Sequence, residues 1–82
     1  MPMNPVDIQA LIEAHLPGCS AVVHSDDNVH FEAVIVSPDF IGKRPLQRHQ
    51  MVYGALGDRM GGDIHALSIK TLTPEEQARR GA

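Results

Sequence analysis

Apolar residues recur along the chain at a helical and a strand spacing, and together with β-forming composition, turn and capping signals they predict three helices and three strands. Residues 4–16 show the first spacing, in which apolar positions three or four apart form one face of a helix. The residues on that face are Ile8, Leu11, Ile12 and Leu16. Asn4 is a favourable N-cap and Pro5 suits the first helical position, so this helix has a clear start. Pro17-Gly18 ends it.

Two segments rich in β-forming residues come next and predict strands over residues 19–25 and 29–37. The stretch Ser25–Asn28 between them has the composition of a tight turn, so the two strands are expected to form an antiparallel hairpin. His30 has the same parity as Glu32 and is therefore expected to face solvent.

A second helix is predicted over residues 45–60. One stripe at helical spacing consists of Leu46, His49, Tyr53, Leu56 and Met60. Gly54 and Gly57 each cost a helix roughly 1 kcal/mol relative to Ala. A neighbour that packs closely at that point would explain why they are tolerated.

A third strand is predicted over residues 64–71, where side chains alternate between two faces. Thr73-Pro74-Glu75-Glu76 is a capping box that starts a last short helix. The order is therefore α-β-β-α-β-α in a single α+β domain over residues 1–82. The sheet is expected to be mixed, with the third strand parallel to the second through a right-handed crossover and the first two helices on one face.

The composition limits the classes of protein to which the chain could belong. It has 82 residues, 43% of them hydrophobic, a formal net charge of −3 and one cysteine. Such a chain suits one folded domain without an internal disulfide. No apolar run is long enough to span a membrane, and the N-terminus does not resemble a secretion signal, so we expect a cytoplasmic protein.

Catalysis has little support in the sequence. Cys19 has no evident base beside it, and a lone cysteine near a strand start is typical of a small core residue. Asp26 and Asp27 are better explained as turn residues than as a catalytic pair. Since no phosphate loop, HExxH helix or CxxC pair is present, we expect that the protein is not an enzyme.

Histidines are the more promising side chains, because neutral imidazole binds borderline metals such as iron and zinc. The chain has five. His65 opens the third strand beside Gly61-Gly62, where a partner could reach it, but its parity with Leu67 and Ile69 also fits a core histidine. His24 and His30 flank the hairpin turn.

Basic residues gather near the start of the second helix. Lys43, Arg44 and Arg48 are expected to lie exposed on one side of it. Cations at a helix N-terminus can hold a phosphate, but the net charge of −3 favours an ordinary solvated face over a phosphate site.

Two blocks of the chain resemble the BolA family. The first, Phe40–Leu56, contains Phe-x-Gly-Lys followed by Arg-His, Val-Tyr and Leu. The second, Ile64–Pro74, is similar to the C-terminal signature of the family, and its His-Ala-Leu-Ser-Ile-Lys resembles the IbaG-like branch. With the second strand, the two blocks cover more than half of the chain.

The resemblance implies a class II KH-like fold and a partnership with a monothiol glutaredoxin. The two proteins would share a [2Fe-2S] cluster in iron–sulfur trafficking and iron regulation, with His65 as one ligand. The second ligand would come from the hairpin, where this chain has no cysteine and His30 or His24 are the candidates. The isolated protein is then expected to contain no cluster, as a monomer or weak homodimer.

The family resemblance also implies an alternative role as a stress-responsive, DNA-binding transcriptional regulator. Lys43, Arg44 and Arg48 are the candidate DNA contacts. Gly42-Lys43-Arg44-Pro45 departs from the Gly-x-x-Gly clamp of RNA-binding KH domains, which weakens any nucleic-acid role.

Overall fold

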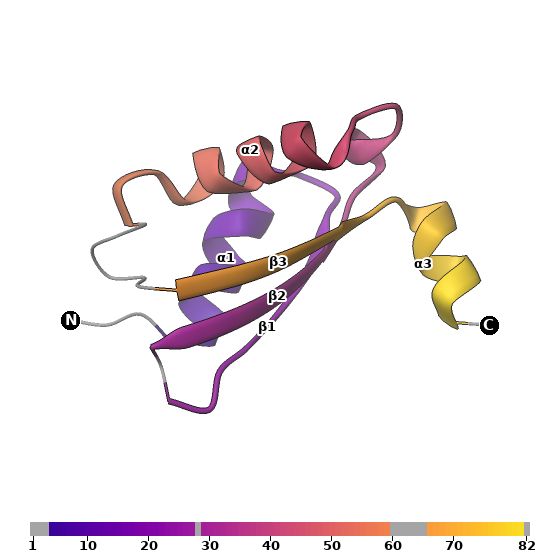
Figure 1. Ribbon diagram of the computed structural model, residues 1–82. Coiled ribbons are helices and arrows are strands. Elements are labelled where there is room, and N and C mark those ends of the chain that lie inside the picture. The colour runs from indigo at the N-terminus through magenta and orange to yellow at the C-terminus, as the bar shows by residue number, and fades with distance from the viewer. Residues whose placement is uncertain (1–3, 28, 60–65, 82) are drawn as a thin grey trace.

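The computed structural model describes residues 4–27, 29–59 and 66–81 (Figure 1). The elements in chain order are α1 (Pro5–His15), β1 (Ser20–His24), β2 (His30–Val36), α2 (Pro45–Leu56), β3 (Ala66–Leu72) and α3 (Pro74–Gly81). Two short 3-10 helices, η1 (Pro38–Phe40) and η2 (Gly57–Arg59), flank α2. The predicted α-β-β-α-β-α order is confirmed.

The sheet has the strand order β1-β2-β3. β1 pairs with β2 in antiparallel register, with Ala21 opposite Ile35. β3 pairs with β2 in parallel register, with Ala66 beside His30. The mixed sheet expected from the sequence is therefore confirmed, while residues 64 and 65 of the predicted third strand lie outside the described residues.

Both α1 and α2 lie on one face of the sheet, while α3 follows the end of β3 (Figure 1). Between these two helices and the sheet lies an aliphatic core with two Phe rings. Its most buried members are Ile8, Ile12, Phe31, Ile35, Phe40 and Val52. The other face of the sheet is open, and Val22 on β1 is 62% exposed there.

The helix starts follow the local signals in the sequence. The Asp7 side chain accepts the Asn4 N–H at 3.4 Å at the start of α1. At the start of α3, Glu76 Oε1 accepts the Thr73 N–H at 2.8 Å and Thr73 Oγ1 accepts the Glu76 N–H at 3.2 Å. This reciprocal pair is the predicted capping box.

The predicted stripe on the second helix is only partly correct. The buried residues of α2 are Val52, which was not in the stripe, and Leu56, which was. Two other residues of the stripe are exposed, Leu46 at 69% and Tyr53 at 38%. The pattern was ambiguous because apolar residues occur all around this helix, and the contact with α1 and the sheet selects the Val52 side. Helix α2 also ends at Leu56, and Met60 lies outside the described residues.

The expected close neighbour of Gly54 is absent from the described part of the chain, where no atom beyond its own helix backbone and its two chain neighbours lies within 4 Å of a Cβ built on it. Gly57 has a different explanation. Its φ of +55° belongs to the region that favours glycine, and its N–H bonds the Tyr53 carbonyl to end α2.

Among the helices of residues 4–27, 29–59 and 66–81, none combines the length and apolar character that a membrane span requires.

Candidate functional site

Two histidines stand at the hairpin end of the sheet. His24 is the last residue of β1 and His30 is the first residue of β2. His24 pairs with Glu32, so side-chain alternation places both rings on the open face. They line a shallow hollow of about 200 Å³, whose wall consists of His24, Ser25, Asp26, Asp27, His30 and Glu32.

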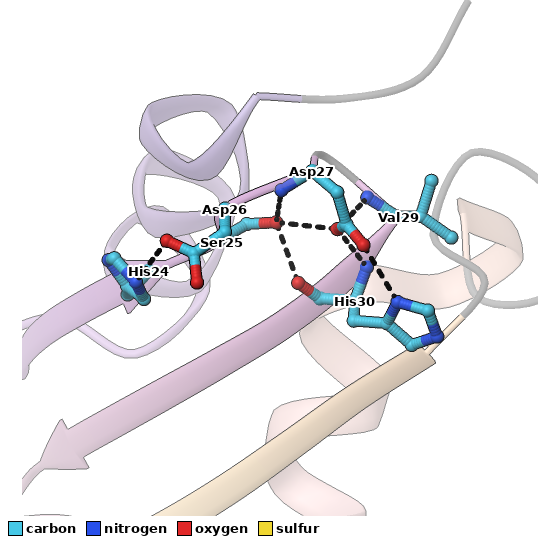
Figure 2. Close-up of polar contacts among 6 residues, drawn as sticks. All are labelled: His24, Ser25, Asp26, Asp27, Val29 and His30. Atoms are coloured by element: carbon cyan, nitrogen blue, oxygen red, sulfur yellow. Dashed lines mark hydrogen bonds and ion pairs between the residues drawn. The ribbon is translucent and has the colours of Figure 1, made fainter.

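The carboxylate of Asp27 holds this turn together (Figure 2). Its Oδ1 accepts the backbone N–H groups of Val29 and His30, each at 2.9 Å. Its Oδ2 lies 3.0 Å from Nδ1 of the His30 ring. The bond from the His30 ring, followed by the two backbone bonds, places the pKa of Asp27 well below its ordinary value.

The ionised Asp27 determines which nitrogen of His30 is available for a ligand. A carboxylate only accepts hydrogen bonds, so Nδ1 of His30 must carry the proton in this contact. In a neutral ring the lone pair is then on Nε2, and the side chain is 75% exposed. An imidazole oriented by a carboxylate in this way is typical of metal-binding histidines.

His24 has a weaker version of the same arrangement. Its Nε2 lies 3.1 Å from Oδ1 of Asp26, and the two side chains are 66% and 93% exposed. Within the described residues the Asp26 carboxylate makes no further hydrogen bond to the backbone, unlike that of Asp27. His24 is therefore less firmly oriented than His30.

His65, the third candidate ligand, lies outside the described residues. In the sequence it directly precedes Ala66, whose partner across the parallel pair is His30. Across the ranges that the structure describes, no three His, Cys, Asp or Glu side chains come together as a metal site.

The three basic residues near the start of α2 differ in their exposure. Lys43 and Arg44 are exposed as predicted. The expected exposure of Arg48 is wrong, because its side chain is only 12% exposed. Its guanidinium donates to the carbonyls of Lys43 and Thr71 and pairs with Glu76 at 2.9 Å, so Arg48 is held inside a structural network.

Cys19 is placed as the sequence predicts. It is half-buried against the core, with Sγ 3.8 Å from the Ile12 carbonyl oxygen. Burial, followed by the negative charge of Glu13, raises the pKa of the thiol. A thiol with a raised pKa is a poor nucleophile near neutral pH.

Sequence reasoning overlooked the second role of Asp27. It correctly identified a turn residue but did not connect the carboxylate to the ring three positions later. The spacing Asp27-x-x-His30 within a tight turn was the available signal, since an aspartate that caps its own turn also faces the side chain that follows.

A three-stranded mixed sheet with two helices on one face and paired histidine–aspartate contacts at a hairpin defines a small α+β domain. A family model described as "BolA-like protein" matches residues 6–76. The chain therefore belongs to the BolA-like family.

Curated relatives agree with this assignment. The chain is 43% identical over 73 residues to "DNA-binding transcriptional regulator BolA" of Escherichia coli, covering 89% of this chain and 66% of that protein. It is 47% identical over 47 residues to human "BolA-like protein 1", covering 57% of this chain. The aligned part spans 34% of the human protein and 46% of the Haemophilus influenzae relative, well under two thirds of their length.

Solved structures show the same fold. A BolA protein homologue from Coxiella burnetii superimposes with a TM-score of 0.85 at 45% identity, covering 94% of this chain and 99% of that one. Yeast Fra2 superimposes with a TM-score of 0.76 at 30% identity, covering 96% of this chain and 88% of that one. Membership of the IbaG-like branch and the KH-like description stay predictions.

Proposed function

We propose that this protein is a non-catalytic BolA-like adaptor that shares a [2Fe-2S] cluster with a monothiol glutaredoxin in iron–sulfur trafficking and in iron and stress regulation. Family membership supports the general role. The observation that carries the proposal is the His30 ring, which is exposed and anchored through Nδ1 to Asp27, with no described residue bonded to its Nε2. Imidazole is an established ligand type for iron–sulfur clusters.

We further propose His30, with His65, as the ligands from this chain. His30 is favoured over His24 for two reasons. Its carboxylate partner is itself fixed by two backbone N–H groups, and its strand neighbour Ala66 directly follows His65 in the chain. The remaining ligands would be thiolates from the glutaredoxin and from glutathione, because the thiolate is the usual cluster ligand.

Co-expression with the monothiol glutaredoxin of the same host, followed by visible absorption and circular dichroism of the purified complex, tests this proposal. His30→Ala and His65→Ala should each change the spectrum, because an imidazole ligand is lost. His24→Ala is the matched control at the same hollow and should leave the spectrum unchanged. A cluster spectrum that changes only in His24→Ala would assign the second ligand to His24, and a complex whose spectrum none of the three changes would overturn the shared-cluster role.

A second candidate function is DNA binding. The Escherichia coli and Haemophilus influenzae relatives are both named DNA-binding transcriptional regulators. Lys43 and Arg44 are exposed at the start of α2 and are the cations that could contact phosphate. Duplex DNA should be titrated at rising salt, and Lys43→Ala should reduce the salt slope by about one if that residue contacts a phosphate. An unchanged slope would remove the residue from a DNA interface.

A further inference from the structure

The side of α2 that faces away from the core presents a leucine and a tyrosine to solvent. Leu46 is 69% exposed and Tyr53 is 38% exposed, although large side chains with apolar surface are commonly packed against the core. The exposed Gln50 and Gly54 continue the same side at helical spacing. We call Leu46, Gln50, Tyr53 and Gly54 the outer strip of α2. The ring of His49 meets Tyr53 edge-on at 6.4 Å and supports the tyrosine.

Gly54 has no evident purpose within the described fold. A glycine inside a helix is less favourable than an alanine. Apart from its own helix backbone and its two chain neighbours, no described atom lies within 4 Å of a Cβ at this position, and its φ is not positive, so an alanine would fit. The absent side chain leaves the helix backbone bare beside Tyr53, where a partner could approach closely.

The chain segment that carries the outer strip contains charges of one sign only. From Ile41 to Leu56 the chain has three Lys or Arg residues and no Asp or Glu. Arg48 is neutralised by Glu76, but Lys43 and Arg44 are exposed and form no ion pair within the described residues. An isolated positive end on a chain of net charge −3 favours a negatively charged partner.

We propose that the outer strip docks an acidic, apolar segment of a partner protein. Carboxylates of the segment would face Lys43 and Arg44, an apolar side chain would contact Leu46 and Tyr53, and its backbone would cross at Gly54. Buried aromatic and aliphatic anchors beside a charged rim are the usual anatomy of such an interface. A protein surface that binds the phosphates of DNA makes little use of an exposed leucine. A protein segment is therefore the better fit for this strip.

This surface is distinct from the histidine site. Helix α2 belongs to the helical layer on one face of the sheet (Figure 1). The strand register and side-chain alternation place His24 and His30 on the opposite, open face. A partner on the outer strip would therefore not cover the hairpin, and the proposal goes beyond the shared-cluster function. Its test uses the isolated protein without glutaredoxin or cluster, so the two proposals fail independently.

Three probes separate the possible occupants: a synthetic amphipathic helical peptide of Glu and Leu, the same peptide with Gln in place of Glu, and a duplex DNA. Binding is measured by fluorescence anisotropy and mapped by amide chemical shifts. We expect the acidic peptide to shift amides between Lys43 and Gly54 and to bind roughly tenfold tighter than the Gln peptide.

The variants test individual contacts. Leu46→Ser should weaken the affinity for the acidic peptide roughly tenfold. Val6→Ser is the control, since Val6 on α1 is 73% exposed but lies outside the outer strip. Gly54→Ala should raise the Tm by roughly 4–8 °C, because alanine stabilises the helix. It should also weaken the affinity for the peptide, because the added methyl group obstructs the approach of the peptide backbone.

Several results would overturn the proposal. Equal affinity for the acidic and Gln peptides would remove the role of Lys43 and Arg44. Docking on this strip would be rejected if Val6→Ser lost as much peptide affinity as Leu46→Ser, or if Gly54→Ala bound the peptide unchanged. DNA that displaces the peptide from the same amides would assign the surface to nucleic acid. Self-association abolished by Leu46→Ser would assign it to a second copy of the chain.

Discussion

Arg48 Nη1 lies 2.9 Å from Glu76 Oε1, so one ion pair joins α2 to α3 across 28 residues of sequence. The same guanidinium donates to the carbonyl of Lys43 at 2.9 Å and to that of Thr71 at 3.3 Å. It also lies 5.9 Å from the centre of the Phe40 ring. Arg48 thus connects a loop, a strand, a helix and the core.

Replacing Arg48 should destabilise the protein. Arg48→Ala removes three hydrogen bonds from a side chain that is 12% exposed and uncovers Phe40. We expect a loss of about 1–3 kcal/mol in the free energy of unfolding, measured by urea denaturation. Arg44→Ala, at an exposed position, should change it by less than about 0.5 kcal/mol. Equal effects of the two substitutions would contradict the structural role of Arg48.

Glu76 should contribute a pH-dependent part of the stability. The Thr73 N–H first, and Arg48 second, lower the pKa of Glu76 in the folded protein. The ionised form is therefore favoured by folding, and its contribution is present above the ordinary Glu pKa of about 4.3 and lost as pH falls towards the lower folded pKa. Glu76→Gln should be less stable than wild type at neutral pH and should approach it in acid. Thermal melts at a series of pH values measure the gap, and a constant gap would refute this linkage.

Two leucines of α2 should differ sharply in how much their replacement by alanine destabilises the protein. Leu56 is 2% exposed and Leu46 is 69% exposed. Leu56→Ala should cost about 2–5 kcal/mol by leaving a cavity, whereas Leu46→Ala should cost less than about 0.5 kcal/mol. Chemical denaturation of both variants provides the comparison. A large loss in Leu46→Ala would instead support the apolar stripe first predicted from spacing.

Loss of the Asp27 carboxylate should loosen the hairpin turn. Asp27→Ala deprives the N–H groups of Val29 and His30 of their acceptor, so their amide hydrogens should exchange faster with solvent. Asp26→Ala is the control, because among the described residues its carboxylate contacts His24 alone. Hydrogen exchange followed by NMR distinguishes the two, and unchanged protection in Asp27→Ala would show that the carboxylate does not hold the turn.

Local signals in the sequence were sufficient for much of the fold. The Thr73–Glu76 capping box and the face of α1 depend on residues a few positions apart, so spacing alone predicts them. The parallel placement of β3 also follows from order, because a helix between two strands allows the right-handed crossover.

Tertiary structure decided what depends on residues distant in the chain. Composition made Arg48 one of three similar cations, and only its position beside Thr71 and Glu76 makes it a largely covered structural anchor. Spacing allowed more than one apolar face on α2, and packing against α1 and the sheet selected Val52 and left Leu46 in solvent. Burial and ion pairing are sums over neighbours that the fold brings together, whereas caps and periodicity are properties of adjacent residues.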